Sequence, residues 1–179
     1  MYKNILDFCF NEAGVEKFFQ KSADFDRELT QRFGTVLQQA AAAEFYTWRT
    51  SINGRLAEII VLDQFSRNIY RDSPAAFAQD AMALTLAQEA ISAGALDTLK
   101  TLEERKFLLM PFMHSESKLI HQQAEKLFKT YTDEQTYGFE MRHKVIIDRF
   151  GRYPHRNTIL GRQSTAEEIE FLKEPGSSF

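Results

Sequence analysis

Cysteine, glycine and proline are all scarce in this chain of 179 residues, which contains one Cys, eight Gly and four Pro. The lone Cys9 can form no internal disulfide, and no Cys-x-x-Cys pair is present to hold zinc. So few glycines and prolines leave little room for long linkers. Because nothing in the cysteine content points to an oxidising compartment, we predict a cytoplasmic location.

Long apolar runs and an excess of basic residues are missing as well. The longest apolar run, Phe107 to Met113, contains Pro111 and is far shorter than the roughly 20 residues that cross a bilayer. Asp7 interrupts the apolar N-terminal stretch, which argues against a signal peptide. The net charge is -3 and the pI is about 5.8, whereas domains that bind a phosphate backbone usually carry a basic surface. The sequence predicts no membrane span and argues against nucleic acid as a partner.

What the chain does have is material for a hydrophobic core. Its residues are 44% hydrophobic and include 16 Phe. A chain of this length buries most of its apolar surface around one core. We therefore predict one domain over residues 1–174 and a frayed tail over residues 175–179.

Apolar residues recur at helical spacing along most of the chain, and no stretch shows the alternation of a strand. Capping patterns mark several helix starts, and Pro111 should break or bend its helix because it lacks an N–H. Short connections favour antiparallel neighbours, so the predicted fold is all-α, with antiparallel helix pairs in a tetratricopeptide-like bundle or superhelix. The predicted helices cover about residues 24–48, 55–70, 73–94, 101–110, 119–131, 132–151 and 165–173.

The first candidate site segment lies on the apolar helix predicted over residues 55–70. Asp63, Arg67 and Arg71 are four residues apart, which places them on one side of that helix. A charged side chain on a buried apolar helix needs an oppositely charged or hydrogen-bonding partner. The three residues can form a ladder that bridges to neighbouring helices, or the guanidinium groups can point at a carboxylate or phosphate of a ligand.

The second segment follows Pro111 and contains His114, Ser115 and Glu116. An imidazole and a carboxylate after a proline bend can turn inward, with His114 as general base and Glu116 as its orienting partner. Alternatively, Ser115 and Glu116 only begin the next helix.

The third segment is strongly basic although the chain as a whole is acidic. Arg152, His155, Arg156 and Asn157 surround a Gly and a Pro and can cradle an anion, or the arginines can pair with acidic helix ends elsewhere. Between Arg142 and Arg162, Asp148 is the only acidic residue. The basic residues of the same segment are Arg142, Lys144, Arg149, Arg152, Arg156 and Arg162.

Metal and nucleotide chemistry find little support. Glu140 and His143 have the Glu-x-x-His spacing of di-iron bundles, but those bundles need the motif twice and only one copy is present. Phosphate-binding glycine loops and the Gly-x-Ser-x-Gly elbow are absent. Cys9 sits among apolar residues, as a core cysteine does, rather than in the setting of a nucleophile. We expect no metal and no cofactor, and we keep His143 as a candidate acid–base residue.

Four stretches together closely resemble the family of bacterial proteins known as domain of unknown function 924. They are Leu62–Arg71, Met110–Glu116, Asp148–Asn157 and Leu160–Leu172. The resemblance spans nearly the whole chain and implies a tetratricopeptide-like helical fold, but no activity. Two departures, Cys9 where the family often has Trp and Ser66 where it often has Pro, resemble packing changes.

Two functions lead after these observations, and a third, RNA binding through the segment from Arg142 to Arg162, has less support. In the first, a polar pocket binds a small anionic molecule and can hydrolyse it by His/Glu acid–base catalysis. Its acid–base candidates are His114, Glu116, His143 and His155, and its ligand-binding candidates are Asp63, Arg67, Arg71, Arg152, Arg156 and Asn157. In the second, a non-catalytic helical scaffold grips an extended peptide and its arginines clamp the peptide's carboxylates. Whether the chain is an enzyme stays open, as does its oligomeric state.

Overall fold

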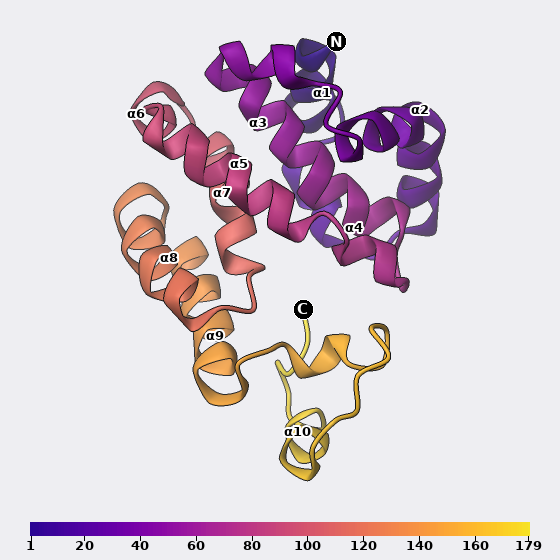
Figure 1. The fold of residues 1–179 in the computed structure, drawn as a ribbon, viewed down its shortest axis with the longest axis vertical. Helices are drawn as coiled ribbons and strands as arrows, with labels where there is room; N and C mark the ends of the chain where they lie inside the picture. The colour runs from indigo at the N-terminus through magenta and orange to yellow at the C-terminus, as the bar shows by residue number, and fades with distance from the viewer.

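A computed structural model describes all 179 residues and contains helices but no strand. This confirms the predicted all-α class (Figure 1). Two short segments, Phe8–Glu12 and Val61–Phe65, are π-helical, and four are 3₁₀ turns: Val15–Phe19, Tyr46–Thr50, Pro74–Phe77 and Pro154–Arg156. The α-helices are α1 (Tyr2–Asp7), α2 (Ala23–Ala41), α3 (Ile52–Ile60), α4 (Ser66–Ile69), α5 (Asp80–Ser92), α6 (Ala95–Thr98), α7 (Leu102–Met113), α8 (Lys118–Tyr131), α9 (Glu134–Phe150) and α10 (Ala166–Phe171).

Side-chain caps explain where several helices begin. Thr101 and Glu104 form a reciprocal capping box at the start of α7, as the sequence predicts. Thr165 and Glu168 form a second one at the start of α10. At the far end of α9, Gly151 adopts a left-handed conformation with φ of 70°, which ends the helix at little steric cost.

Four predicted helices have different bounds in the structure. The helix expected over residues 73–94 is divided, because Pro74–Phe77 forms a 3₁₀ turn and α5 runs only from Asp80 to Ser92. The helix expected over residues 24–48 ends at Ala41, and a turn and a 3₁₀ segment follow it. The helix expected from Arg55 begins at Ile52, because Ser51 accepts a hydrogen bond from the N–H of Gly54 and so caps it earlier. α7 continues through Pro111 to Met113. One proline so close to a helix end removes only a single hydrogen bond of the ladder.

The main hydrophobic core lies around α3, which is buried on nearly every side. Phe8, Phe18, Phe33 and Phe65 pack their rings against one another there. Cys9 is fully buried in the same core, and burial raises the pKa of its thiol. A smaller second cluster contains Ile146, Ile147 and Tyr153, where α9 meets the chain that follows it.

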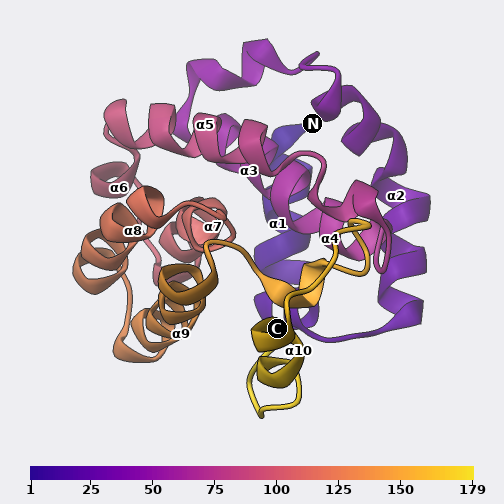
Figure 2. The same ribbon diagram turned by 60° about the horizontal axis from the view of Figure 1, so that its bottom comes forward.

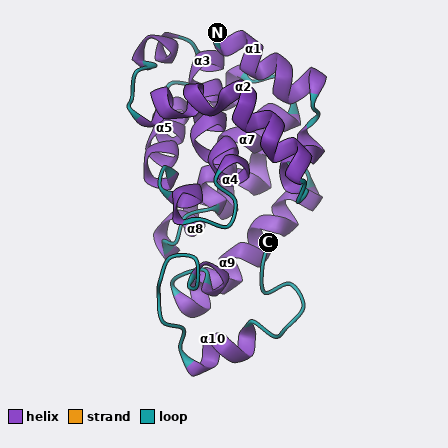
Figure 3. Ribbon diagram, turned by 90° about the vertical axis from the view of Figure 1, so that its right-hand side faces the viewer, coloured by secondary structure: helices purple, strands orange, loops and turns teal.

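Several helices pack side by side, and not all of these pairs are successive in the chain. α3 contacts both α1 and α5, α7 contacts α8, and α8 lies along α9. Beyond α9 the chain leaves the helical body, forms the turn at residues 154–156, reaches α10 and turns back (Figures 2 and 3). No helix has both the length and the apolar content to cross a membrane.

Candidate functional site

The first part of the site is a contact between Asp63 and His114. Asp63 lies in the π-helical segment Val61–Phe65 and is 1% exposed. His114 follows the last residue of α7, and its Nδ1 lies 2.7 Å from Oδ1 of Asp63. Gln64 donates a second hydrogen bond to the carboxylate of Asp63. Two residues 51 positions apart in sequence thus form a buried carboxylate–imidazole pair.

The protonation states of this pair follow from its surroundings. Burial opposes ionisation of Asp63, but the charges of Arg67 and His114 outweigh it and lower the pKa of Asp63 to about 2. Burial, assisted by the charge of Arg67, lowers the pKa of His114. At neutral pH an ionised Asp63 therefore accepts the Nδ1–H of a neutral His114. The lone pair on Nε2 then has no partner within the protein.

A chain of ion pairs extends from Asp63 to the basic loop. Nη1 of Arg67 lies 2.9 Å from Oδ1 of Asp63, and Nη2 of Arg67 lies 3.0 Å from Oδ1 of Asp80, the first residue of α5. The other oxygen of Asp80 is 3.4 Å from Nη1 of Arg156. His114, Asp63, Arg67, Asp80 and Arg156 thus form one connected network, which we call the polar centre.

Arg156 differs from the other arginines of the site. Its guanidinium carbon lies 4.7 Å from the ring centre of Phe77 and 4.5 Å from that of Tyr153, so two aromatic rings contact it. Its only carboxylate contact is the long one with Asp80, and its buried Nε has no hydrogen-bond partner. Burial, together with the charge of Arg67, lowers the pKa of Arg156. Arg156 therefore has hydrogen-bonding capacity to spare and no bidentate carboxylate partner.

Two further histidines lie around Tyr153. Nδ1 of His143 is 2.8 Å from the carbonyl oxygen of Phe139 and must donate to it, so the Nε2 of a neutral His143 carries a lone pair. Burial lowers the pKa of His143 to about 3. Burial and the charge of Arg156 lower that of His155 to about 4, and its buried Nδ1 has no partner. The ring of Phe179 stacks on His143 with 3.7 Å between the ring centres.

Tyr153 connects the polar centre to a second buried pair. Its hydroxyl donates to the carbonyl of Met113 at 2.5 Å and lies 3.2 Å from Nε2 of His121. Nδ1 of His121 is 2.7 Å from Oε1 of Glu140, and both residues are fully buried. This contact joins α8 to α9, next to Tyr153.

Glu116 is not the partner of His114 that the sequence predicts. Arg162 binds both of its oxygens, at 2.6 and 2.9 Å, and the N–H of Tyr153 donates to it at 2.7 Å. The reason is spatial: the carboxylate of Asp63 faces His114 across the packed helices, while Glu116 holds the loop that follows α9. The structure therefore assigns the orienting position to Asp63.

Two of the predicted arginines lie in ordinary structural ion pairs. Arg152 binds both oxygens of Glu168, at 2.6 and 2.7 Å, and so holds α10 against the loop. Arg71 binds both oxygens of Asp26 in α2. Asn157 lies between Ser164 and Glu168. Of the predicted set, the structure brings Asp63, Arg67, His114 and Arg156 into the polar centre, with His143 and His155 grouped around the adjacent Tyr153.

Sequence reasoning missed Asp80, Tyr153 and His121 as members of the site. Asp80 opens a helix as many acids do, and nothing in its neighbourhood distinguishes it. Tyr153 stands inside the Asp148–Asn157 stretch of the family resemblance, which is the one signal that singles it out.

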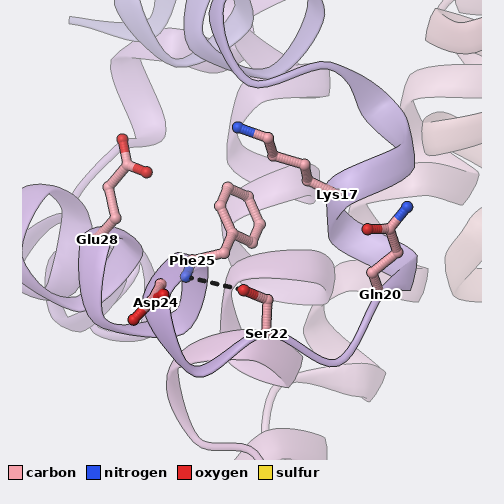
Figure 4. A pocket seen from close by; sticks show the side chains of 6 residues that line it. All are labelled: Lys17, Gln20, Ser22, Asp24, Phe25 and Glu28. Atoms are coloured by element: carbon pink, nitrogen blue, oxygen red, sulfur yellow. Dashed lines mark hydrogen bonds between the residues drawn. The ribbon is translucent and has the colours of Figure 1, made fainter.

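Metal binding finds no support in the geometry, because no group of three or more His, Cys, Asp or Glu side chains is arranged to hold an ion. Two open hollows lie away from the polar centre. One, of about 230 Å³, adjoins the start of α2 and is lined by Lys17, Gln20, Ser22, Asp24, Phe25 and Glu28 (Figure 4). The other, of about 470 Å³, runs between α5, α7 and α8.

Comparison with known proteins gives two matches. The model of a family described as bacterial protein of unknown function, DUF924, matches residues 5–176. A solved structure, a protein of unknown function named ATU0120 from Agrobacterium tumefaciens, is 34% identical, and the match covers 96% of each chain with a TM-score of 0.90. No curated protein matches the chain.

Proposed function

We propose that this chain, which belongs to the DUF924 family of bacterial proteins, binds a small anionic ligand at the polar centre and uses His114 as a proton acceptor. The observation that carries the proposal is the Asp63–His114 pair, at 2.7 Å. An ionised carboxylate fixes the tautomer and the orientation of the imidazole, and this leaves a basic Nε2 free. Structural ion pairs do not require such a free nitrogen.

Arg156 supplies the anion-binding half of the proposal. Arg71, Arg152 and Arg162 each bind both oxygens of one carboxylate through two guanidinium nitrogens. Arg156 has only the 3.4 Å contact with Asp80, two aromatic rings contact its guanidinium carbon, and its buried Nε has no partner. An arginine held flat between rings presents a preorganised fork to a carboxylate or phosphate.

The chemistry that the geometry favours is hydrolysis of an anionic ester. Nε2 of His114 would take a proton from a water molecule while the water oxygen bonds to the acyl carbon. The imidazolium would then return that proton to the departing alkoxide as its bond to the acyl carbon breaks. Burial and the charge of Arg67 favour a neutral His114, and Asp63 orients its ring before the proton transfer, which is the state a base requires.

Binding is tested with acetate and inorganic phosphate as probes, by calorimetry and by NMR of the arginine side chains. We expect Arg156→Gln to weaken binding at least about tenfold, because one charge-assisted hydrogen bond contributes about 1.5–3 kcal/mol. Arg149→Gln is the matched control, since Arg149 is an exposed arginine paired with Glu167. Equal weakening by both substitutions, or by neither, would contradict the proposal.

Catalysis is tested separately with a panel of anionic p-nitrophenyl esters. His114→Asn keeps an N–H that can donate to Asp63 but removes Nε2, so kcat should fall about 10²- to 10⁴-fold with little change in KM. The rate should rise with pH along a limb whose midpoint lies below the ordinary histidine value, since burial lowers the pKa of His114. A protein that binds the anions but hydrolyses none of the esters would be a binding protein.

A scaffold that binds peptides is the second candidate, and one observation favours it. The chain already places one of its own side chains, Phe179, against the site: its ring stacks on His143. Antiparallel helix pairs such as α8 and α9 also support a tetratricopeptide-like arrangement, which often presents grooves to extended partners.

A further inference from the structure

The surface next to the polar centre consists of three rings from different parts of the chain. His143 comes from α9, while Tyr153 and His155 come from the loop that follows it. Tyr153 meets His143 edge-on, with 5.7 Å between the ring centres, and His155 lies 5.6 Å from Tyr153. We call these three residues the aromatic surface.

One aromatic side chain already lies on this surface. The ring of Phe179 is 3.7 Å from the ring of His143 and nearly parallel to it, at 18°. The same ring approaches His155 at 5.9 Å and Tyr153 at 6.4 Å, both nearly perpendicular. These are the stacked and edge-to-face geometries that aromatic rings prefer. The surface therefore already accommodates a six-membered aromatic ring.

The segment that carries Phe179 is held by few contacts. Gly176 turns the chain with φ of 78°, and the hydroxyl of Ser177 donates to the carbonyl of Leu172 at 3.2 Å. No hydrogen bond or ion pair connects residue 178 or 179 to the rest of the molecule. The ring of Phe179 is also 55% exposed although it stacks on His143. Such a ring can leave without breaking a polar contact.

The aromatic surface and the anion-binding arginine share one residue. The ring of Tyr153 contacts Arg156 at 4.5 Å and also meets Phe179. An aromatic ring in place of Phe179 and the guanidinium of Arg156 therefore both contact the ring of Tyr153. His143 and His155 are neutral around pH 7, because burial lowers the pKa of both, so they do not oppose an apolar ring there.

We propose that the ligand of this protein is a small aromatic anion, whose ring lies on His143, Tyr153 and His155 and whose charged group pairs with Arg156. Phe179 occupies the position of that ring when no ligand is bound and must move before the ligand can bind. The part of this inference that concerns Arg156 rests on the proposed function. The part that concerns the aromatic surface does not.

Three probes separate the two parts. Phenylacetate has a ring and a negative charge, acetate has the charge alone, and benzyl alcohol has the ring alone. Their dissociation constants are measured by NMR titration on the full chain and on Phe179→Ala. We expect Phe179→Ala to bind phenylacetate about five- to twentyfold more tightly than the unaltered chain. In that variant, phenylacetate should bind at least about tenfold more tightly than either acetate or benzyl alcohol.

Controls make each result decisive. Phe19→Ala removes another half-exposed phenylalanine, one that packs on Phe107, and should leave every dissociation constant unchanged. Adding His143→Ala to Phe179→Ala should reduce phenylacetate binding to the level of acetate. If that double variant does not fold, Phe179→Leu provides the second measurement: it keeps an apolar side chain without the stacked ring and should bind phenylacetate more tightly than the unaltered chain.

The outcomes also separate this inference from the proposed function. If Phe179→Ala binds phenylacetate no more tightly than the unaltered chain, or no more tightly than it binds acetate, the inference is overturned. Acetate binding that depends on Arg156 would still support the proposed function in that case. If benzyl alcohol binds the variant while acetate shows no dependence on Arg156, the aromatic surface is established and the anion half fails.

Discussion

His121 is a fully buried histidine whose two ring nitrogens each have a partner. Its Nε2 lies 2.8 Å from the carbonyl oxygen of Ser115, which can only accept, so Nε2 carries the hydrogen. A neutral His121 then has a lone pair on Nδ1, and the proton in the 2.7 Å contact belongs to Glu140. Burial raises the pKa of Glu140.

This assignment predicts a clear difference between two substitutions. Glu140→Gln retains an N–H that can donate to Nδ1 of His121, so we expect the unfolding free energy to change by no more than about 1 kcal/mol. Glu140→Ala leaves a cavity and an unpartnered buried nitrogen, and should lower it by about 2–4 kcal/mol. Urea denaturation measures both. Equal losses would show that the pair is an imidazolium and a carboxylate instead.

Single residues also show how far the site could be predicted from sequence. The helical spacing of Asp63 and Arg67 places them together, and the structure keeps them together at 2.9 Å. The partner of His114 could not be found in this way, because Asp63 lies 51 residues away and only tertiary packing brings the two side chains into contact. Glu116, two residues from His114, was the nearer candidate and was wrong as its partner.

Among the elements, α3 depends on a glycine that has no room for a side chain. A Cβ at Gly54 would lie 2.1 Å from the backbone oxygen of Trp48, which belongs to the 3₁₀ segment before the helix. Gly34 sits inside α2 with nothing within 4 Å of the same position. One helical glycine is therefore required by packing and the other is not.

The two glycines give a matched pair of alanine substitutions. Gly54→Ala must push the 3₁₀ segment away from α3 and should lower the unfolding free energy by about 1–3 kcal/mol. Gly34→Ala should raise it by about 0.5–1 kcal/mol, because alanine loses less conformational freedom when it enters a helix. Thermal and chemical denaturation of both variants tests this. A stabilising Gly54→Ala would contradict the close contact.

Helix boundaries were predictable where a local signal sets them. The capping boxes at Thr101 and Thr165 and the helix end at Gly151 each depend on residues that are neighbours in the sequence. The early end of α2 was not predictable, since Ala42, Ala43 and Glu44 continue a helix-forming sequence, yet Ala43 adopts a left-handed conformation with φ of 58° and ends the helix. The π-helical segments have no sequence signal either, because their apolar residues fit an ordinary α-helix equally well.

Over the whole molecule, buried neutral histidines make stability depend on pH. Burial lowers the pKa of His143 to about 3 in the folded protein, whereas a histidine in an unfolded chain has a value of about 6.5. Between these values the unfolded chain binds a proton that the folded protein does not. Stability from this residue is therefore fully present above about pH 6.5 and is lost as the pH falls toward 3.

The expected slope is about 1 kcal/mol of unfolding free energy per pH unit between pH 6 and 4, which approaches the limit for one group. His143→Asn keeps a donor for the carbonyl of Phe139 but cannot titrate, so its stability should depend on pH less steeply by that amount. Asp63, whose folded pKa is about 2, adds to the slope only at the acidic end of this range and does so in both proteins, so its contribution cancels in the comparison. Urea unfolding of the unaltered protein and of His143→Asn across this pH range measures the two slopes. Equal slopes would contradict the assignment of this pH dependence to His143.

The π-helical turn at Val61–Phe65 also has a consequence for the history of the family. Such a turn takes up one residue more than an α-helical turn, so removing one residue there would restore a regular helix. The helix on either side would keep its register, because the bulge takes up the extra residue, but the residues within the turn would shift, and Asp63 would no longer point at His114. A one-residue gap at this position in an alignment would therefore identify the relatives that lack the carboxylate–imidazole pair, whatever residues stand beside the gap.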